Sequence, residues 1–135
     1  MKITRFFFVM TFLATINISA QEQVERIINE VEFKSDKILL EKKEAFNYRK
    51  DGNHFLVLDL NNNELIIGDI TSLGDGKFSS VITFVAENKK FSNAKIIGRS
   101  DLFFAMLNNN VITKEFKIDP EKLDLFFAKY NELKN

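Results

Sequence analysis

Two apolar runs of strand length, NHFLVLDL and ELIIGDI, lie close together between Asn53 and Ile70. The asparagines Asn61 to Asn63 separate them, and asparagine tolerates the left-handed backbone conformations that tight turns require. The pattern predicts a β-hairpin, and the nearly continuous apolar character of its first strand is typical of a strand with both faces covered. The remaining chain must therefore supply neighbouring strands and at least one covering element.

The first residues have the layout of a secretory signal peptide. A basic start with Lys2 and Arg5 precedes an apolar centre, and small and polar residues end the segment at Ala20. We expect residues 1–20 to be cleaved, leaving residues 21–135 as one exported domain without a membrane span. The alternative is an uncleaved anchor, but the apolar part is short for a span of about 20 residues. The sequence leaves open whether the product is periplasmic or secreted.

Composition excludes several classes of function. Without the signal, 17 basic and 19 acidic residues remain, scattered along the chain, whereas nucleic-acid binding favours a concentrated basic face. The chain has no cysteine and one histidine, so it offers neither disulfides nor a typical zinc ligand set. We therefore predict no nucleic-acid partner, no cofactor and no metal.

Before the central hairpin, residues 21–34 show apolar spacing typical of an amphipathic helix, which predicts an N-terminal helix. The apolar positions are Val24, Ile27, Ile28 and Val31. Ile38 to Leu40 fits either a short helix or a strand. Ala45 to Lys50 alternates apolar and polar residues and predicts a strand that turns at Asp51-Gly52 into the hairpin.

After the hairpin, glycines and polar residues predict a loop from Thr71 to Lys77. Strands are expected at Phe78 to Ala86 and at Phe91 to Ile97. A second hairpin is expected, with strands at Leu102 to Leu107 and Val111 to Ile118 joined through Asn108 to Asn110. Its LNNN turn repeats that of the first hairpin, which suggests two turns of the same type.

The C-terminus predicts an amphipathic helix that reaches about Leu133. Asp119 is a good N-cap, and Pro120 suits the first helical position, where its missing N–H costs nothing. The apolar stripe comprises Leu123, Phe126, Phe127, Tyr130 and Leu133. We therefore predict an α+β domain, with a mainly antiparallel sheet of about five to seven strands and both terminal helices packed on it.

Three groups of residues have types that could carry chemistry. His54 could act as a base with Asp59 or Asp69 and with Ser79 or Ser80, although no nucleophile elbow supports a triad. Asp59, Asn61 and Asn63 match the start of a calcium loop, but Glu64 and Ile70 stand where that loop needs glycine and glutamate. For glycoside hydrolysis, which needs two carboxylates, Asp69 and Asp75 form the least implausible pair. We assign no catalytic, cofactor or metal residue to any of them.

Phenylalanine is unusually abundant, and two adjacent pairs, Phe103-Phe104 and Phe126-Phe127, can each turn one ring away from the core. Such rings could be covered, line a ligand pocket or form a partner surface. We expect an exported module that binds another protein, such as an inhibitor, an immunity-type protein or an accessory protein of the cell envelope. The alternative is a carrier of an apolar small molecule in a Phe-lined cavity, and a small hydrolase is the third possibility.

Overall fold

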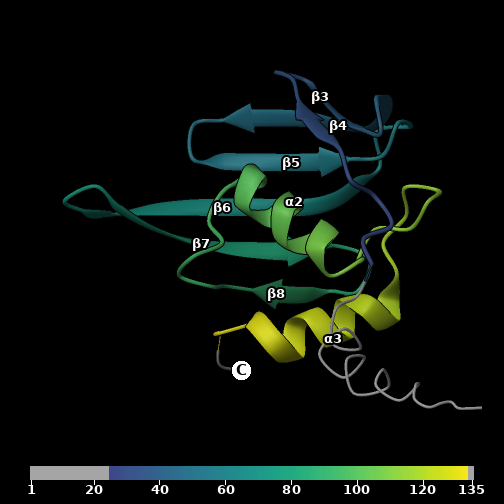
Figure 1. The fold of residues 1–135 in the computed structure, drawn as a ribbon. Helices are drawn as coiled ribbons and strands as arrows, with labels where there is room; N and C mark the ends of the chain where they lie inside the picture. Colours follow the sequence, from purple (N-terminus) through teal and green to yellow (C-terminus); the bar gives the residue numbers. More distant parts are fainter. Residues whose placement is uncertain (1–24, 134–135) are drawn as a thin grey trace, which may run out of the picture.

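The computed structural model describes residues 25–133, so the expected signal peptide and its cleavage after Ala20 lie outside the described residues. These residues contain one antiparallel sheet of seven strands, which pair in chain order, and two helices (Figure 1). The elements are β2 (Val31–Phe33), β3 (Lys37–Leu40), β4 (Lys43–Asp51), β5 (His54–Leu58), β6 (Glu64–Gly74), β7 (Lys77–Phe84), β8 (Lys89–Phe91), α2 (Arg99–Asn108) and α3 (Pro120–Tyr130). The prediction of a mainly antiparallel α+β architecture is confirmed.

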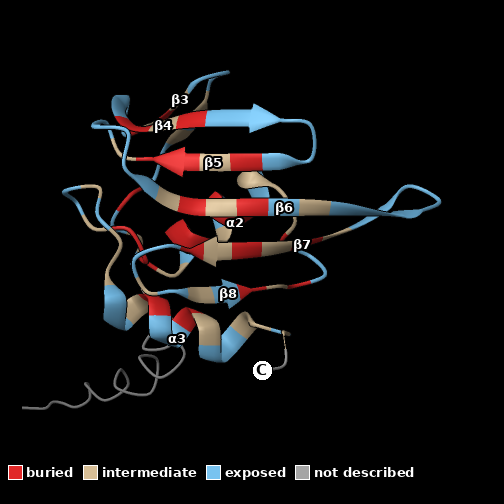
Figure 2. Cartoon of the chain, turned by 180° about the vertical axis from the view of Figure 1, so that it is seen from behind, coloured by how far each residue is buried: buried red, intermediate tan, exposed pale blue. Residues whose placement is uncertain are grey.

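Both helices lie on one side of the sheet. Helix α2 crosses the face of the sheet, and α3 lies beside β8 (Figure 1). Among the described residues, no helix covers the opposite face, and along the strands half-buried or exposed residues alternate with buried ones (Figure 2). The core therefore lies between the helices and the sheet, and the inward side chains of the strands form part of it. Its largest fully buried side chains include Phe46, Phe55, Phe84, Phe91, Phe103 and Phe126.

The central hairpin is formed by β5 and β6 as predicted. Its turn is closed by Asp59, whose Oδ1 accepts the backbone N–H groups of Asn61 and Asn63, each at 2.9 Å. Gly68 lies opposite Phe55, and a Cβ atom on this glycine would stand 2.1 Å from Cε2 of the Phe55 ring. The glycine therefore makes room for an aromatic ring on the neighbouring strand.

The prediction of a loop from Thr71 to Lys77 is wrong. Strand β6 continues to Gly74 and β7 begins at Lys77, so the two strands extend past the rest of the sheet as a long two-stranded ribbon (Figures 1 and 2). Only the tip needs turn chemistry, with positive φ values of 88°, 55° and 74° at Gly74, Asp75 and Gly76. The polar Thr71 is compatible with an exposed strand because β-branched residues fit pleated backbone.

The predicted second hairpin is also wrong. Leu102 to Leu107 lies in α2, and Val111 to Ile118 is irregular apart from a bridge between Ile112 and Ile118. A short apolar run fits a strand or a buried helix equally well. The structure buries Leu102, Phe103, Met106 and Leu107, positions that recur with the period of a helix. The second LNNN motif therefore ends a helix.

The structure also differs from the prediction around β8 and decides between the two alternatives at β3. The strand expected from Phe91 to Ile97 is mostly irregular, because β8 ends at Phe91 and only an Asn93–Ile96 bridge follows. The segment Ile38 to Leu40, which fitted helix or strand, belongs to β3.

The helix predicted over residues 21–34 lies partly outside the described residues. From Glu25 onward the chain is irregular, and it forms β2 at Val31–Phe33. The side chain of Asn110 accepts the N–H of Ile27 and donates to the carbonyl of Glu25, each at 2.9 Å. These long-range bonds satisfy backbone groups that a helix would have paired locally.

Helix α3 is confirmed, although it ends at Tyr130, before Leu133. The carboxylate of Asp119 accepts the N–H groups of Glu121 and Lys122, at 3.0 and 3.3 Å. Leu123 and Phe126 are fully buried, whereas Phe127 is half-buried. Neither described helix has the length and apolar character that a membrane span requires.

Candidate functional site

The one histidine has a carboxylate partner. His54 and Asp69 face each other on β5 and β6, and His54 Nδ1 lies 2.6 Å from Asp69 Oδ1. Their side chains are 47% and 62% exposed, on the face that neither α2 nor α3 covers. Cross-strand pairs of this kind stabilise sheets by about 0.2–1 kcal/mol. The pair could orient an imidazole for proton transfer, but it lies on open surface.

The serines considered as nucleophiles do not complete this pair. Ser80 points to the covered face, where its buried hydroxyl donates to the carbonyl of Ile96 at 3.4 Å. Ser79 lies on β7 opposite Thr71, one residue pair further toward the ribbon tip than the opposing Ile70 and Ser80. Asp59, the other candidate acid, follows the far end of β5. The structure therefore joins His54 to Asp69 alone among these candidates.

The oxygens of the calcium-like motif serve the turn itself. Besides the two backbone bonds to its Oδ1, Asp59 accepts the side-chain amide of Asn63 on Oδ2 at 2.9 Å. The Asn63 side-chain bond, together with the backbone bonds, lowers the pKa of Asp59 below its ordinary value. Within residues 25–133, no three His, Cys, Asp or Glu side chains cluster as a metal site would require.

The suggested pair of Asp69 and Asp75 is not brought together. Asp75 follows Asp69 by six positions along extended β6 and its turn, which corresponds to roughly 20 Å, whereas glycosidase carboxylates stand about 5–9.5 Å apart. Asp75 lies at the ribbon tip, between two glycines of positive φ. Those glycines shape a turn.

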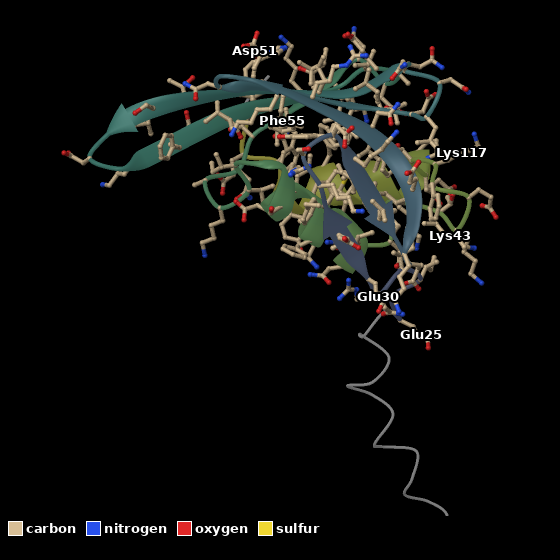
Figure 3. All side chains as sticks on the ribbon, turned by 90° about the horizontal axis from the view of Figure 1, so that it is seen from above. Glu25, Glu30, Lys43, Asp51, Phe55 and Lys117 are labelled. Carbon is tan, nitrogen blue, oxygen red and sulfur yellow. The ribbon has the colours of Figure 1, made fainter. Side chains whose placement is uncertain are left out.

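A groove of about 460 Å³ opens where the start of α2 faces strands β4 to β6. Figure 3 shows Phe55 on the helix side of the sheet, while Asp51 points away from the helices. The lining residues combine an aromatic and aliphatic floor with polar walls. They are Ser35, Tyr48, Lys50, Phe55, Ile70, Gly98, Arg99, Ser100 and Asp101.

Arg99 forms one wall of this groove. Its guanidinium lies 3.9 Å from the ring centre of Tyr48 and 5.1 Å from that of Phe33, and its Nη1 donates to the carbonyl of Lys34 at 2.8 Å. Burial raises the pKa of Tyr48, and the nearby positive charge of Arg99 partly opposes this rise. Stacking of this kind holds a guanidinium in a defined orientation.

The ribbon beyond the groove carries large apolar side chains in the open. Leu73 is 62% exposed and Phe78 is 49% exposed. The register pairs Phe78 with Ser72 and places it two residues from Ser80, on the same face of the sheet as the groove. Phe78 therefore places one exposed aromatic ring on the groove face of the ribbon.

Neither the groove nor the ribbon was predicted from the sequence. Arg99 lies between the strands that were expected at Phe91 to Ile97 and at Leu102 to Leu107, and the ribbon was interpreted as a loop. The sequence does contain a signal for the start of α2, which forms one wall of the groove. Gly98, Arg99, Ser100 and Asp101 precede an apolar run, and small and acidic residues favour helix starts.

Comparisons with protein-family models, with curated proteins and with solved structures gave no match.

Proposed function

We propose that this protein is an exported binding module that acts by contacting another protein of the cell envelope, as an inhibitor, an immunity-type protein or an accessory factor. The observation that carries the proposal is the projecting ribbon of β6 and β7. It places two large apolar side chains, Leu73 and Phe78, in water. Single exposed apolar residues are ordinary, but a concentration of them on a projection favours a contact surface.

The ribbon also suits recognition through its backbone. Beyond the neighbouring strands, β6 and β7 pair with each other, so their outer edges present free N–H and C=O groups that an extended partner can bond. Soluble proteins normally blunt such edges with charge or cover them. Within the ribbon, the charged residues Asp75 and Lys77 lie only near the tip, close in sequence to the apolar Leu73 and Phe78.

The alternative of an apolar carrier has less support. A carrier needs a cavity of roughly 300 Å³ or more that encloses most of its ligand, whereas the groove at the start of α2 is open to solvent. In this structure, aromatic rings pack on one another between the sheet and the helices. Phe91 stacks on Phe126 with ring centres 5.0 Å apart, and Phe46 meets Phe103 edge-on at 5.7 Å.

A small hydrolase is favoured only by the His54–Asp69 pair, to which neither Ser79 nor Ser80 is hydrogen-bonded within residues 25–133. The substitution His54→Ala separates the two classes of function. A hydrolase that uses His54 should lose its activity, whereas a binding module should keep its partner. Loss of partner binding in a folded His54→Ala protein would show that the His54–Asp69 surface is used.

Quantitative affinity capture from the envelope of producing cells tests the proposal. Phe78→Asp should remove a specific partner, whereas Leu125→Asp should not, because Leu125 is 65% exposed on α3, away from the ribbon. Both substitutions replace an exposed apolar residue with the same acid. Equal capture by wild type and Phe78→Asp, with both proteins folded, would contradict a role for the ribbon.

A further inference from the structure

We infer that the pocket between the turn after β5, the turn after β7 and residues 113–118 binds an arginine side chain of another protein. The inference goes beyond the proposed contact through the ribbon, because Leu65 and Ala86 in this pocket lie at the opposite ends of β6 and β7 from the ribbon tip. Figure 3 shows Lys117, which also lines the pocket, at the end of the molecule away from the ribbon. Three properties of the pocket carry the inference: its size, its charges and its aromatic wall.

The size of the pocket suits one side chain. Its volume is about 190 Å³, whereas sites for drug-sized ligands have about 300–1,000 Å³. Its apolar walls are Leu65, Ala86, Phe116 and Ile118. Such walls can pack on the aliphatic stem of a long side chain while the charged end group stays at polar residues. The pocket therefore favours the end of a long side chain over a whole small molecule.

The charges of the pocket favour a cation. Asp59 and Glu87 supply two carboxylates against the one ammonium group of Lys117. Asp59 is held ionised, because the side-chain and backbone hydrogen bonds from Asn63 lower its pKa, and the charge of Lys117 contributes to the same shift. Glu87 is half-buried and forms no ion pair within residues 25–133. Its carboxylate is therefore the group that an incoming guanidinium can pair with.

Phe116 gives the pocket its aromatic wall. Its φ is 63°, in the left-handed region that an aromatic residue rarely adopts. The loop holds this conformation, since the N–H of Phe116 donates to the carbonyl of Thr113 at 2.9 Å and the N–H of Thr113 donates to the carbonyl of Lys117 at 2.8 Å. Among the described residues, no other ring and no cation stacks on the Phe116 ring. A planar guanidinium can stack on an aromatic ring and pair with a carboxylate, which favours arginine over lysine.

The first test titrates N-acetyl-arginine methylamide into the isotope-labelled protein obtained by expressing the full chain. We expect amide NMR shifts at Ala86, Glu87 and Phe116, with a dissociation constant of about 1 mM for a single side chain. The matched citrulline compound replaces the guanidinium with an uncharged urea of the same shape and should bind at least about fivefold more weakly. Equal binding of the two compounds, or absence of shifts at these three residues, would overturn the inference.

Two further probes test the choice of occupant. N-acetyl-lysine methylamide, with its side-chain amine free, should bind more weakly than the arginine compound, because an ammonium group is a compact point charge without a flat face. Tighter binding of the lysine compound would overturn the preference for arginine. Free arginine should bind no better than the capped compound, and tighter binding of the free amino acid would overturn a protein side chain as the occupant.

Substitutions by glutamine locate the site through the sign of their effects. Glu87→Gln should weaken binding of the arginine compound about fivefold, whereas Lys117→Gln should strengthen it about twofold, since it removes a competing cation. Glu115→Gln makes the same change as Glu87→Gln at an exposed residue outside the pocket lining, and should alter binding less than about twofold. Equal effects of the two glutamate substitutions, or weaker binding by Lys117→Gln, would overturn the site.

The variant Phe116→Leu tests the aromatic wall. Leucine keeps the wall apolar but has no aromatic face, so we expect binding of the arginine compound to weaken about threefold. Unchanged binding by the folded variant would overturn the role of the ring. Phe78→Asp on the ribbon should leave arginine binding unchanged, so failure of this inference and failure of the proposed function are distinguishable. Loss of arginine binding in folded Phe78→Asp would overturn the assignment to this pocket.

Discussion

Gly68 is the residue at which the backbone and a core ring come closest. A Cβ atom there would stand 2.1 Å from the ring of Phe55, which is itself 1% exposed. We expect Gly68→Ala to lower the free energy of unfolding by about 1–3 kcal/mol, because the ring must move from its packed position. Denaturant melts measure this change.

A double-mutant cycle tests the stated cause. If the clash with the ring is responsible, Gly68→Ala should cost less in a Phe55→Leu background than in the wild type, because a smaller side chain leaves room for the methyl group. Simple additivity of the two changes would show that the cost has another origin.

Asp59 carries a second prediction at the residue scale. Hydrogen bonds from the side chain and backbone of Asn63 lower its pKa in the folded protein. A lowered pKa means that its contribution to stability is present above about pH 4 and is lost as the pH falls through the folded value. In Asn63→Ala, we expect the pKa of Asp59 to rise toward its ordinary value. Carboxyl NMR titration of both proteins would show this, and identical pKa values would refute the account of the turn.

Helix α3 shows at the scale of an element how much one buried ring contributes. Phe126 is 1% exposed and stacks on Phe91, whereas the adjacent Leu125 is 65% exposed. We expect Phe126→Ala to cost about 3–5 kcal/mol and Leu125→Ala less than about 0.5 kcal/mol. The double change Phe126→Ala and Phe127→Ala should leave the domain barely stable or unfolded, since domains are stable by about 5–15 kcal/mol.

Denaturant melts of Phe126→Ala, Leu125→Ala and the double mutant measure how much α3 contributes to stability. A midpoint that hardly moves in the double mutant would mean that α3 does not contribute to the core. The search for a partner surface would then begin at α3.

The elements differ in how far the sequence could predict them, for physical reasons. Helix α3 and the β5–β6 hairpin were predicted correctly, because a cap, a proline and an asparagine turn act locally. Helix α2 was not, because a six-residue apolar run fits two periods and its burial is decided by tertiary packing. The extent of the ribbon depends on pairing between β6 and β7, which single-strand composition does not reveal.

The candidate site was harder to predict than the fold. His54 and Asp69 were named as possible partners, and their pairing follows from the hairpin register. Tyr48 and Lys50 are neighbours on β4, but Arg99 lies far from them in the sequence and meets them only when α2 packs on the sheet. Their common role therefore could not be inferred without the topology.

At the scale of the whole molecule, export is the first matter to test. The layout of residues 1–20 predicts that the mature chain begins at Gln21. Intact-mass measurement on protein recovered from the cell envelope should give the mass of residues 21–135. Recovery of the full chain in a membrane fraction would show instead that the segment is retained as an anchor.

The central claim is that the projecting ribbon contacts a protein partner. A photo-activated cross-linking residue placed at Leu73, in cells that produce the full chain, tests it most directly. We predict one discrete cross-linked partner that disappears when Phe78→Asp is added, and no such product from the same residue at Leu125, which is equally open to solvent on α3. The same products from both positions, or none from Leu73 in a folded protein, would contradict the claim.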